Sequence, residues 1–480
     1  MSLSQIEPQI IWKNFSALNA VPRPSKKEER VINFIKNFGE NLGLETSVDK
    51  TGNVIIRKPA TQGMENRQPI VLQSHLDMVC QKNNDVNFDF DNQGIEMYVD
   101  GDWVRAKGTT LGADNGLGVA AMMSILESTD IAHPALEALF TIDEETGMTG
   151  AFGLEPNTLN GEILLNLDTE EDDEIDIGCA GGIDVTATQK YNTQKVTENG
   201  FRITVKGLKG GHSGMDIHKG LGNANKILAR FLMLAVAHEP RLVSIDAGSL
   251  RNAIPREGSV SVLVANKEVF STEFETLKSE ILEEFATLEK DLNISIESCD
   301  IKGNALSVED STKVILALNA AHNGVYRMSP DVEDLVEASN NIARVELKDG
   351  ALQILNLSRS SVESSKLAVA NQLRASFELA GMEVKFSGSY PGWKPKPGAE
   401  IIKVMEEIYQ REFNSKPNVV ACHAGLECGI IGANYPKMEM VSFGPTIKGA
   451  HSPNERASIS STQKFWKFLK EILANIPKKK

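Results

Sequence analysis

The feature that most constrains the fold is an alternation of short apolar segments with helix-periodic segments in the first 185 residues. The segments with the apolar composition of buried strands are 53–57, 69–77, 138–143 and 162–168, and those with helical spacing are 28–42 and 115–126. Strands that alternate with helices predict an α/β layer around a largely buried sheet. The same texture returns after the proline- and glycine-rich segment 390–398, so we expect one α/β domain that is interrupted by a long insertion.

The insertion has a different pattern. Strands with alternating polarity, 201–205 and 259–264, are each followed or preceded by amphipathic helices, 221–237 and 273–292. This order indicates a separate α+β unit. We therefore divide the chain into a first part of the catalytic domain at 1–185, an inserted lid at 186–396 and a second part of the catalytic domain at 397–480.

Part of the insertion resembles itself. The string LVSIDAGSLRNAIPREGSVSVLV, which begins at Leu242, shares a leading Leu-Val and one arginine with LVEASNNIARVELKDGALQILNL, which begins at Leu335. In both places a strand and a long helix follow. A duplicated lid is one interpretation and chance similarity is the other.

Composition excludes several classes of protein. The formal net charge of −15 disfavours nucleic acid as a partner. The sequence contains no run of about 18 apolar residues that would predict a transmembrane helix, and its first 15 residues do not resemble a secretion signal. The five scattered cysteines are typical of reduced thiols, so we expect a cytoplasmic protein with no membrane partner.

Acidic residues and histidines follow the predicted strands, where open α/β sheets bind ligands. His75 and Asp77 end one strand and face the same side of it, so Asp77 can orient the His75 ring for metal binding. A buried His–Asp pair without a metal is the alternative. Asp114 precedes an apolar helix, where a helix-capping role competes with metal binding.

Three further positions have the same placement. Glu144 and Glu145 follow a strongly apolar strand, where a cation would relieve the repulsion between carboxylates and one of them could act as a general base. A solvated acidic turn is the alternative. Asp168 closes another apolar strand, and His451 follows a strand and a glycine-rich turn.

Together these residues predict a site for two divalent metal ions. Two histidines and at least three carboxylates suit zinc, with cobalt or manganese as alternatives, and one shared carboxylate can join two ions. No GxSxG or HExxH motif offers a competing nucleophile or zinc site. The expected chemistry is hydrolysis by a metal-activated water.

The order of the motifs carries a resemblance to a known family. SHLDM, GADNG, DEETGM, NLD, GGHSG, RNAIPRE and GAHSP occur in the order found in the metallopeptidase family of carboxypeptidase G, aminoacylase-1 and acetylornithine deacetylase. The longer strings GTTLGADNG, GCAGGID, HAGLECG and GPTIKGAHSP resemble its branch of aminoacyl-histidine dipeptidases, also called cytosolic non-specific dipeptidases or peptidase D. The resemblance runs from about Pro24 to the last helix and implies a two-metal exopeptidase domain with a mixed sheet flanked by helices, interrupted by a lid.

The resemblance also implies a role for each site residue. It makes His75 and Asp168 ligands of one metal, Glu145 and His451 ligands of the other, and Asp114 the bridge, with a cis peptide bond to Asn115. Asp77 then orients His75, and Glu144 passes a proton from the attacking water to the leaving amine. In the lid, the implied substrate contacts are His212 and Asn252 at the carbonyl oxygen and Arg359 at the free carboxylate.

The implied substrates are dipeptides, including Xaa-His compounds such as β-alanyl-histidine. The alternatives are an N-acyl-amino-acid deacylase and a non-catalytic metal or peptide binder. In relatives with a duplicated lid, the second half of the lid takes the place of a partner subunit. The resemblance therefore favours a site that is complete within one chain, and a homodimer stays an open alternative. Asp143 departs from the branch, where an uncharged residue is expected, and its charge could shift the pKa of Glu144.

Overall fold

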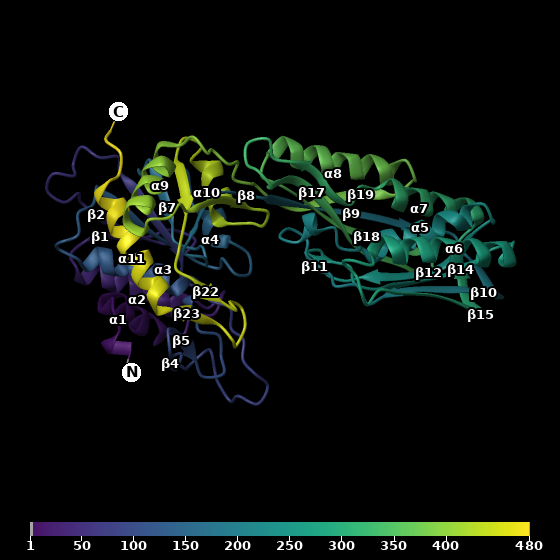
Figure 1. The fold of residues 1–480 in the computed structure, drawn as a ribbon, viewed down its shortest axis with the longest axis horizontal. Helices are drawn as coiled ribbons and strands as arrows, with labels where there is room; N and C mark the ends of the chain where they lie inside the picture. Colours follow the sequence, from purple (N-terminus) through teal and green to yellow (C-terminus); the bar gives the residue numbers. More distant parts are fainter. Residues whose placement is uncertain (1–2, 480) are drawn as a thin grey trace. The chain divides into compact units, whose positions relative to one another are not determined.

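A computed structural model describes residues 3–479, which form two compact units (Figure 1). The first unit contains Met1–Gly178, Pro395–Ala421 and Leu426–Lys480, and the second contains Cys179–Lys394 with the short segment Cys422–Gly425. The first unit therefore includes both ends of the chain, and the second is built mainly from one continuous insertion.

An eight-stranded mixed sheet forms the centre of the first unit. In order across the sheet, its strands are β1 (Glu45–Val48), β2 (Val54–Lys58), β6 (Leu136–Thr141), β3 (Ile70–His75), β7 (Ile163–Asn166), β21 (Glu439–Ser442), β8 (Glu174–Cys179) and β20 (Asn418–Cys422). The four middle strands β6, β3, β7 and β21 are parallel, so their carboxyl ends meet at one edge. A second sheet contains β22 (Ile447–Lys448), β23 (Arg456–Ser458), β5 (Trp103–Ala106) and β4 (Met97–Asp100).

Helices of the first unit surround this sheet. They are η1 (Leu3–Gln5), α1 (Gln9–Asn19), α2 (Glu29–Asn41), α3 (Ala113–Glu127), α4 (Thr149–Gly153), α9 (Glu400–Phe413), α10 (Glu427–Asn434) and α11 (Ile459–Ala474). Helix α3 is almost entirely buried because its sequence after Asn115 is apolar on every side. It packs against α1 and β3, which places its first turn beside the carboxyl end of β3.

The second unit is built on a nine-stranded antiparallel sheet. Its strands in order are β15 (Asn293–Ala305), β10 (Gln194–Lys206), β14 (Gly258–Leu263), β12 (Arg241–Gly248), β17 (Val336–Lys348), β18 (Ala351–Ser360), β9 (Gly181–Lys190) and β19 (Glu383–Tyr390), with β16 (Gly324–Met328) paired to β17. The remaining elements are β11 (Gly211–His212), β13 (Ala253–Ile254), η2 (Ile217–Lys219), α5 (Ala224–Val236), α6 (Lys267–Phe285), α7 (Val308–Ala320) and α8 (Glu363–Glu378). The helices α5 to α8 cover the sheet over one continuous apolar core (Figure 1).

The strand order in the second unit repeats. One half has the chain order β10, α5, β12, β14, α6, β15, and the other has β9, α7, β17, β18, α8, β19. Across the sheet the first half runs β15, β10, β14, β12, and the second half runs in the reverse order of equivalent strands, β17, β18, β9, β19. The two halves meet where β12 pairs with β17. The two strings that share a Leu-Val start form β12 with β14 and β17 with β18, which hold equivalent places, so the topology supports the duplicated lid.

The predicted strands and helices of the α/β unit occur where the sequence placed them, within a few residues. The helix expected over 273–292 begins earlier, at Lys267, and ends at Phe285. Among residues 3–479, no helix combines the length and the apolar character needed to cross a membrane.

Asn223 connects the two halves of the second unit and supplies the first prediction. Its side-chain oxygen caps α5 by accepting from the N–H groups of Asn225 and Lys226, and its amide donates to Asn323 and to the Ile342 carbonyl. We expect Asn223→Ala to lower the free energy of unfolding by about 2–3 kcal/mol, because a buried cap and two donors are lost together. Urea denaturation followed by circular dichroism would measure this.

The matched variant is Asn223→Ser, which keeps the cap but not the amide donors. It should lose about half as much stability. Equal midpoints for both variants and the wild type would contradict the capping account.

Candidate metal centre

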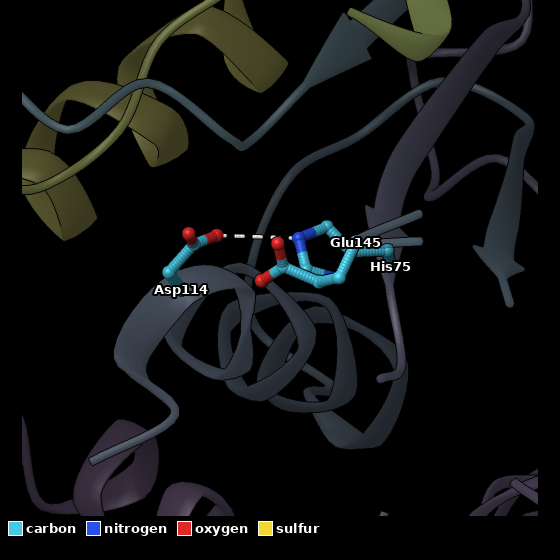
Figure 2. A group of neighbouring side chains, drawn as sticks. All are labelled: His75, Asp114 and Glu145. Carbon is cyan, nitrogen blue, oxygen red and sulfur yellow. Dashed lines mark hydrogen bonds and ion pairs between the residues drawn. The ribbon is translucent and has the colours of Figure 1, made fainter. Parts of the chain in front are cut away.

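The carboxyl edge of the first unit's sheet brings together the predicted metal ligands. His75 ends β3, Glu145 lies four residues after β6, and Asp168 lies two residues after β7. Asp114 stands in the first turn of α3, and His451 follows β22. Figure 2 shows the side chains of His75, Asp114 and Glu145 gathered at one place, and one ligand atom from each lies within 4.8 Å of the others.

Asp114 lies between the two histidines. Its Oδ1 is 3.2 Å from His75 Nε2, and its Oδ2 is 3.0 Å from His451 Nε2. Each histidine nitrogen also faces a second carboxylate: His75 Nε2 is 3.5 Å from Asp168 Oδ1, and His451 Nε2 is 3.1 Å from Glu145 Oε2. The five residues therefore form two sets that share one bridging carboxylate.

The donor set fits two divalent cations. Oε1 of Glu145 and Oδ1 of Asp168 are buried and have no hydrogen-bond partner, although buried carboxylate oxygens are normally satisfied. Nitrogen and carboxylate oxygen donors in this ratio are those that zinc, cobalt and manganese bind.

The acid–base behaviour of the ligands agrees with this. Burial alone would lower the pKa of His75, but Asp168, Asp114 and Asp77 outweigh it and hold that pKa well above its ordinary value. The carboxylates of Asp114 and Glu145 accept hydrogen bonds from His451 and raise its pKa to about 11. Without a cation, the carboxylates thus draw protons onto the two imidazoles.

Asp77 supports both the ring and the acidic loop. Its Oδ1 is 3.3 Å from His75 Nδ1, which leaves Nε2 pointing to the centre. Its two oxygens also accept the backbone N–H groups of Glu144 and Glu145 at 3.1 and 3.2 Å, and Oδ2 accepts from the Ser25 hydroxyl. Asp77 therefore fixes the loop that carries two further site residues, a role that the sequence did not reveal.

Like the predicted metal ligand Asp168, whose pKa burial raises to about 6, Glu144 has a shifted pKa. Burial raises its pKa well above the ordinary value, and the charges of Asp168, Glu427 and Glu145 add to this while His75 opposes it. Asp143, the unexpected acid before it, is buried and accepts from the hydroxyls of Thr146 and Thr149. The Asp143 carboxylate is therefore held by its own loop.

Two residues that the sequence analysis missed hold the segment that leads to Asp114. The buried carboxylate of Glu455 accepts four successive backbone N–H groups, those of Leu111, Gly112, Ala113 and Asp114, at 2.7, 2.9, 2.7 and 3.2 Å. The buried guanidinium of Arg23 donates to the Gly112 carbonyl at 2.6 Å and to the carbonyls of Leu76 and Asp77. No local signal could identify Glu455, because its partners are backbone groups more than 340 positions away.

The turn at Asp114 has two special features. Gly112 has a φ of +68°, and a Cβ there would come within 2.5 Å of Arg23 Nη2, so only glycine fits. The Asp114–Asn115 peptide bond is cis, as the family resemblance implied. The Asn115 side chain donates to the Leu167 carbonyl at 2.6 Å, which connects this turn to the segment that carries Asp168.

The three predicted substrate contacts lie in the second unit. His212 in β11 pairs with Ala253 in β13, so its neighbour Asn252 lies beside the His212 loop, and the Asn252 carbonyl accepts from the Ser213 N–H at 2.8 Å. Arg359 in β18 places Nη2 3.5 Å from His212 Nε2. The structure therefore brings His212, Asn252 and Arg359 together.

The surroundings of His212 define its tautomer. Its Nδ1 accepts from the backbone N–H groups of Gly214 and Met215 at 3.2 and 3.1 Å, so this nitrogen carries a lone pair. Burial and the charge of Arg359 lower the pKa of His212. The two shorter contacts at Nδ1 outweigh the 3.5 Å approach of Arg359 Nη2, which can only donate, so the neutral ring has its proton on Nε2 and that atom is a hydrogen-bond donor.

Tyr390 orients the arginine. Arg359 is 4% exposed, and its Nη1 donates to the Tyr390 hydroxyl at 2.9 Å. The Tyr390 ring lies so close to Gly182 that a Cβ there would approach it within 2.7 Å. This contact accounts for the small residue at Gly182 in the GCAGGID string.

Two polar residues of the HAGLECG string, His423 and Glu427, belong to different units. His423, in the second unit, is buried and makes a 2.7 Å contact with the Ser339 hydroxyl. Glu427 begins α10 in the first unit, and its Oε2 accepts from Gln73 and Thr141. Glu427 is thus part of the buried polar structure of the sheet.

Comparisons with known proteins cover nearly the whole chain. The sequence profile of "Peptidase family M20/M25/M40" matches residues 71–475. Over 486 aligned residues the chain is 45% identical to the cytosol non-specific dipeptidase of Escherichia coli (strain K12), with 99% of each chain covered. The crystal structure of aminoacylhistidine dipeptidase from Vibrio alginolyticus superposes with a TM-score of 0.95 at 44% identity, covering 100% of this chain and 99% of that one.

A more distant structure shares the fold. Aminopeptidase PepT from Bacillus cereus ATCC 10987 superposes with a TM-score of 0.59 at 16% identity, covering 98% of this chain and 99% of that one.

The second prediction concerns the hydrogen bonds from the backbone N–H groups of residues 111–114 to Glu455, here called the Glu455 clamp. In Glu455→Ala, four buried N–H groups lose their acceptor, which should lower the free energy of unfolding by at least about 3 kcal/mol. Hydrogen exchange measured by mass spectrometry should show faster exchange in peptides that contain residues 111–114.

Glu137→Ala is the matched control. Glu137 is also buried and accepts the N–H groups of Asn160 and Gly161, but it lies at the start of β6, at the other end of the strands. It should leave exchange at 111–114 at the wild-type rate. Unchanged exchange there in Glu455→Ala would contradict the clamp.

Proposed function

The chain belongs to peptidase family M20/M25/M40, and from this premise we propose that it is a metal-dependent dipeptidase that uses two divalent cations. The observation that carries the proposal is the Asp114 carboxylate. One of its oxygens faces His75 and the other faces His451, and each side is completed by a second carboxylate, from Asp168 or Glu145.

Each metal site takes one histidine and one acid of its own. His75 with Asp168 holds one cation, His451 with Glu145 holds the other, and Asp114 joins them. Zinc is the first candidate, with cobalt and manganese as alternatives. When bound, such a pair of cations lowers the pKa of a water molecule and polarises the scissile carbonyl.

Glu144 acts as the general base and then as the general acid. It accepts a proton from the attacking water as the new C–O bond forms, and it returns that proton to the amine nitrogen as the C–N bond breaks. The raised pKa of Glu144 supports this role, because it makes the carboxylate a stronger base toward the attacking water.

The family resemblance assigns substrate contacts to three residues of the second unit. His212, with its proton on Nε2, donates to the carbonyl oxygen as negative charge develops there, and Asn252 adds a polar contact. Arg359, oriented by Tyr390, binds the free carboxylate of the substrate with parallel hydrogen bonds. A clamp on a free carboxylate places the cleaved bond next to the C-terminus of the substrate, which suits an exopeptidase, and a dipeptide is the shortest such substrate.

The names of the relatives suggest the substrate range. The Escherichia coli relative is a non-specific dipeptidase of the cytosol, and the Vibrio alginolyticus enzyme is an aminoacylhistidine dipeptidase. We carry over from them a cytoplasmic location and hydrolysis of Xaa-His dipeptides, including β-alanyl-histidine, together with other dipeptides.

The third prediction tests this function. The protein loaded with zinc, cobalt or manganese should hydrolyse free dipeptides faster than their N-acetylated forms, and Glu144→Gln should lose about 10²–10⁴-fold in kcat while it keeps its metals. Product release measured by chromatography, with metal content measured by mass spectrometry, gives both results. Glu137→Gln, a buried change away from the site, serves as the control.

Two results would contradict the assignment. Faster hydrolysis of the acetylated compound would indicate a deacylase. Two bound metals without hydrolysis of any dipeptide would indicate a metal-binding protein without this activity.

The fourth prediction concerns metal binding itself. His75 and His451 must lose their protons to coordinate, and neighbouring carboxylates raise the pKa of both, that of His451 to about 11. Metal uptake at mildly alkaline pH should therefore release about two protons per chain, and metal affinity should fall as the pH is lowered. A pH-indicator dye in weak buffer measures the release.

His451→Ala is the matched variant and should release about one proton fewer. Metal uptake without proton release would show that the two histidines are already neutral before they coordinate, and would contradict their raised pKa values.

A further inference from the structure

A chain of buried polar side chains crosses the first unit's sheet just below the metal centre. It contains one residue from each of five neighbouring strands, β6, β3, β7, β21 and β8, with one loop residue and the first residue of α10. In that order these residues are Thr141, Gln73, Asn166, Ser442 and Asp176, with Thr169 from the loop and Glu427 from α10. All seven are buried.

In the half of this side-chain network near α10, the donor and the acceptor of each hydrogen bond are defined. Glu427 Oε2 accepts from both Gln73 Nε2 and the Thr141 hydroxyl at 2.7 Å. Gln73 Oε1 in turn accepts from Asn166 Nδ2 at 2.5 Å, and Asn166 Oδ1 accepts from the Ser442 hydroxyl. Glu427 is therefore the terminal acceptor, and its other oxygen, Oε1, is buried with no hydrogen-bond partner.

The other half requires one proton more than its hydroxyls supply. Ser442 has used its proton on Asn166, yet its Oγ is also 2.9 Å from Thr169 Oγ1. Thr169 Oγ1 is in turn 2.9 Å from Asp176 Oδ2. If Thr169 donates to Ser442, the contact with Asp176 needs a proton, and only the Asp176 carboxyl can provide it.

We propose that Asp176 is a neutral carboxylic acid that donates to Thr169 and sets the direction of the whole chain, and that Asp176 and Glu427 are positioning residues for the metal centre. This network of side chains holds Gln73 on β3 and Asn166 at the end of β7. Gln73 lies two positions before His75, and Asn166 lies two positions before Asp168. The inference rests on the proposed function in that it treats His75 and Asp168 as metal ligands.

Position and burial support the assignment. Gln73 and His75 lie two apart on β3 and so face the same side of the sheet, which places the network beneath His75. At Asn166, the last residue of β7, it adjoins the segment that leads to Asp168. Burial raises the pKa of both end carboxyls, Asp176 and Glu427, to about 7, so the hydrogen-bond directions decide between them. A fully hydrogen-bonded buried network fixes side chains more strongly than isolated contacts do, so it can keep the spacing of two strand ends constant.

Infrared difference spectroscopy tests the proton directly. The metal-loaded wild type minus Asp176→Asn, at mildly acidic pH, should show the carbonyl stretch of a protonated carboxylic acid that the variant lacks, with a downshift in deuterated water. If the band is instead missing only from Glu427→Gln, the chain runs in the opposite direction and the assignment to Asp176 is wrong. If neither variant lacks a band, the chain holds no such proton and the proposal fails.

Metal affinity tests the positioning role. Asp176→Asn keeps a donor to Thr169 and should bind metal within about twofold of wild type, whereas Asp176→Leu breaks the chain and should lose about 10–100-fold in affinity. Competition with a chromogenic chelator measures this, and circular dichroism checks that each variant is folded. At saturating metal, the KM for a dipeptide should stay unchanged in both.

The controls separate this inference from the proposed function. Glu137→Gln, at the opposite end of β6, should bind metal as the wild type does. Equal metal affinity in Asp176→Leu and wild type would overturn the positioning role. A wild type that binds no metal would overturn the proposed function instead, while the infrared band would still report on Asp176.

Discussion

The first unit's site depends on how the backbone is held around Asp114. Its carboxylate can face two histidines only because the preceding segment is fixed from both sides, with Glu455 on four N–H groups and Arg23 on the Gly112 carbonyl. Successive N–H groups that converge on one carboxylate form an anion-binding nest. Here the anion belongs to the protein, and it makes one turn of backbone rigid.

The same contacts link the ligand-bearing segments to one another. Arg23 also holds the carbonyls of Leu76 and Asp77, just after His75, and Asn115 holds the Leu167 carbonyl, just before Asp168. Glu455 itself lies four residues after His451. The ligands therefore come from distant parts of the sequence, but short hydrogen bonds between their backbones set their spacing.

Much of this site could be predicted from the sequence, for a physical reason. His75, Glu145 and Asp168 follow apolar strands, and parallel strands bring their carboxyl ends to one edge. What could not be predicted was the support: Glu455 and Arg23 act on backbone groups, which look the same at every position of a sequence. Likewise, no pattern indicated that Asp77 would hold the Glu144–Glu145 backbone or that Tyr390 would orient Arg359.

The first unit contains two groups of neighbouring acids, one buried and one partly buried, and their hydrogen bonds distinguish them. In the group of Glu28, Asp77 and Asp143, each carboxylate accepts from protein donors: Glu28 from the Asp143 N–H, Asp77 from two N–H groups and Ser25, and Asp143 from two threonines. In the group that contains His75, Asp114 and Glu145, the protein supplies donors only through two histidines and leaves Glu145 Oε1 without one. A buried carboxylate oxygen without a donor is costly unless a cation accompanies it. Acidity alone would not separate the two groups, but the missing donor favours the second as the proposed cation site and the first as a purely structural group.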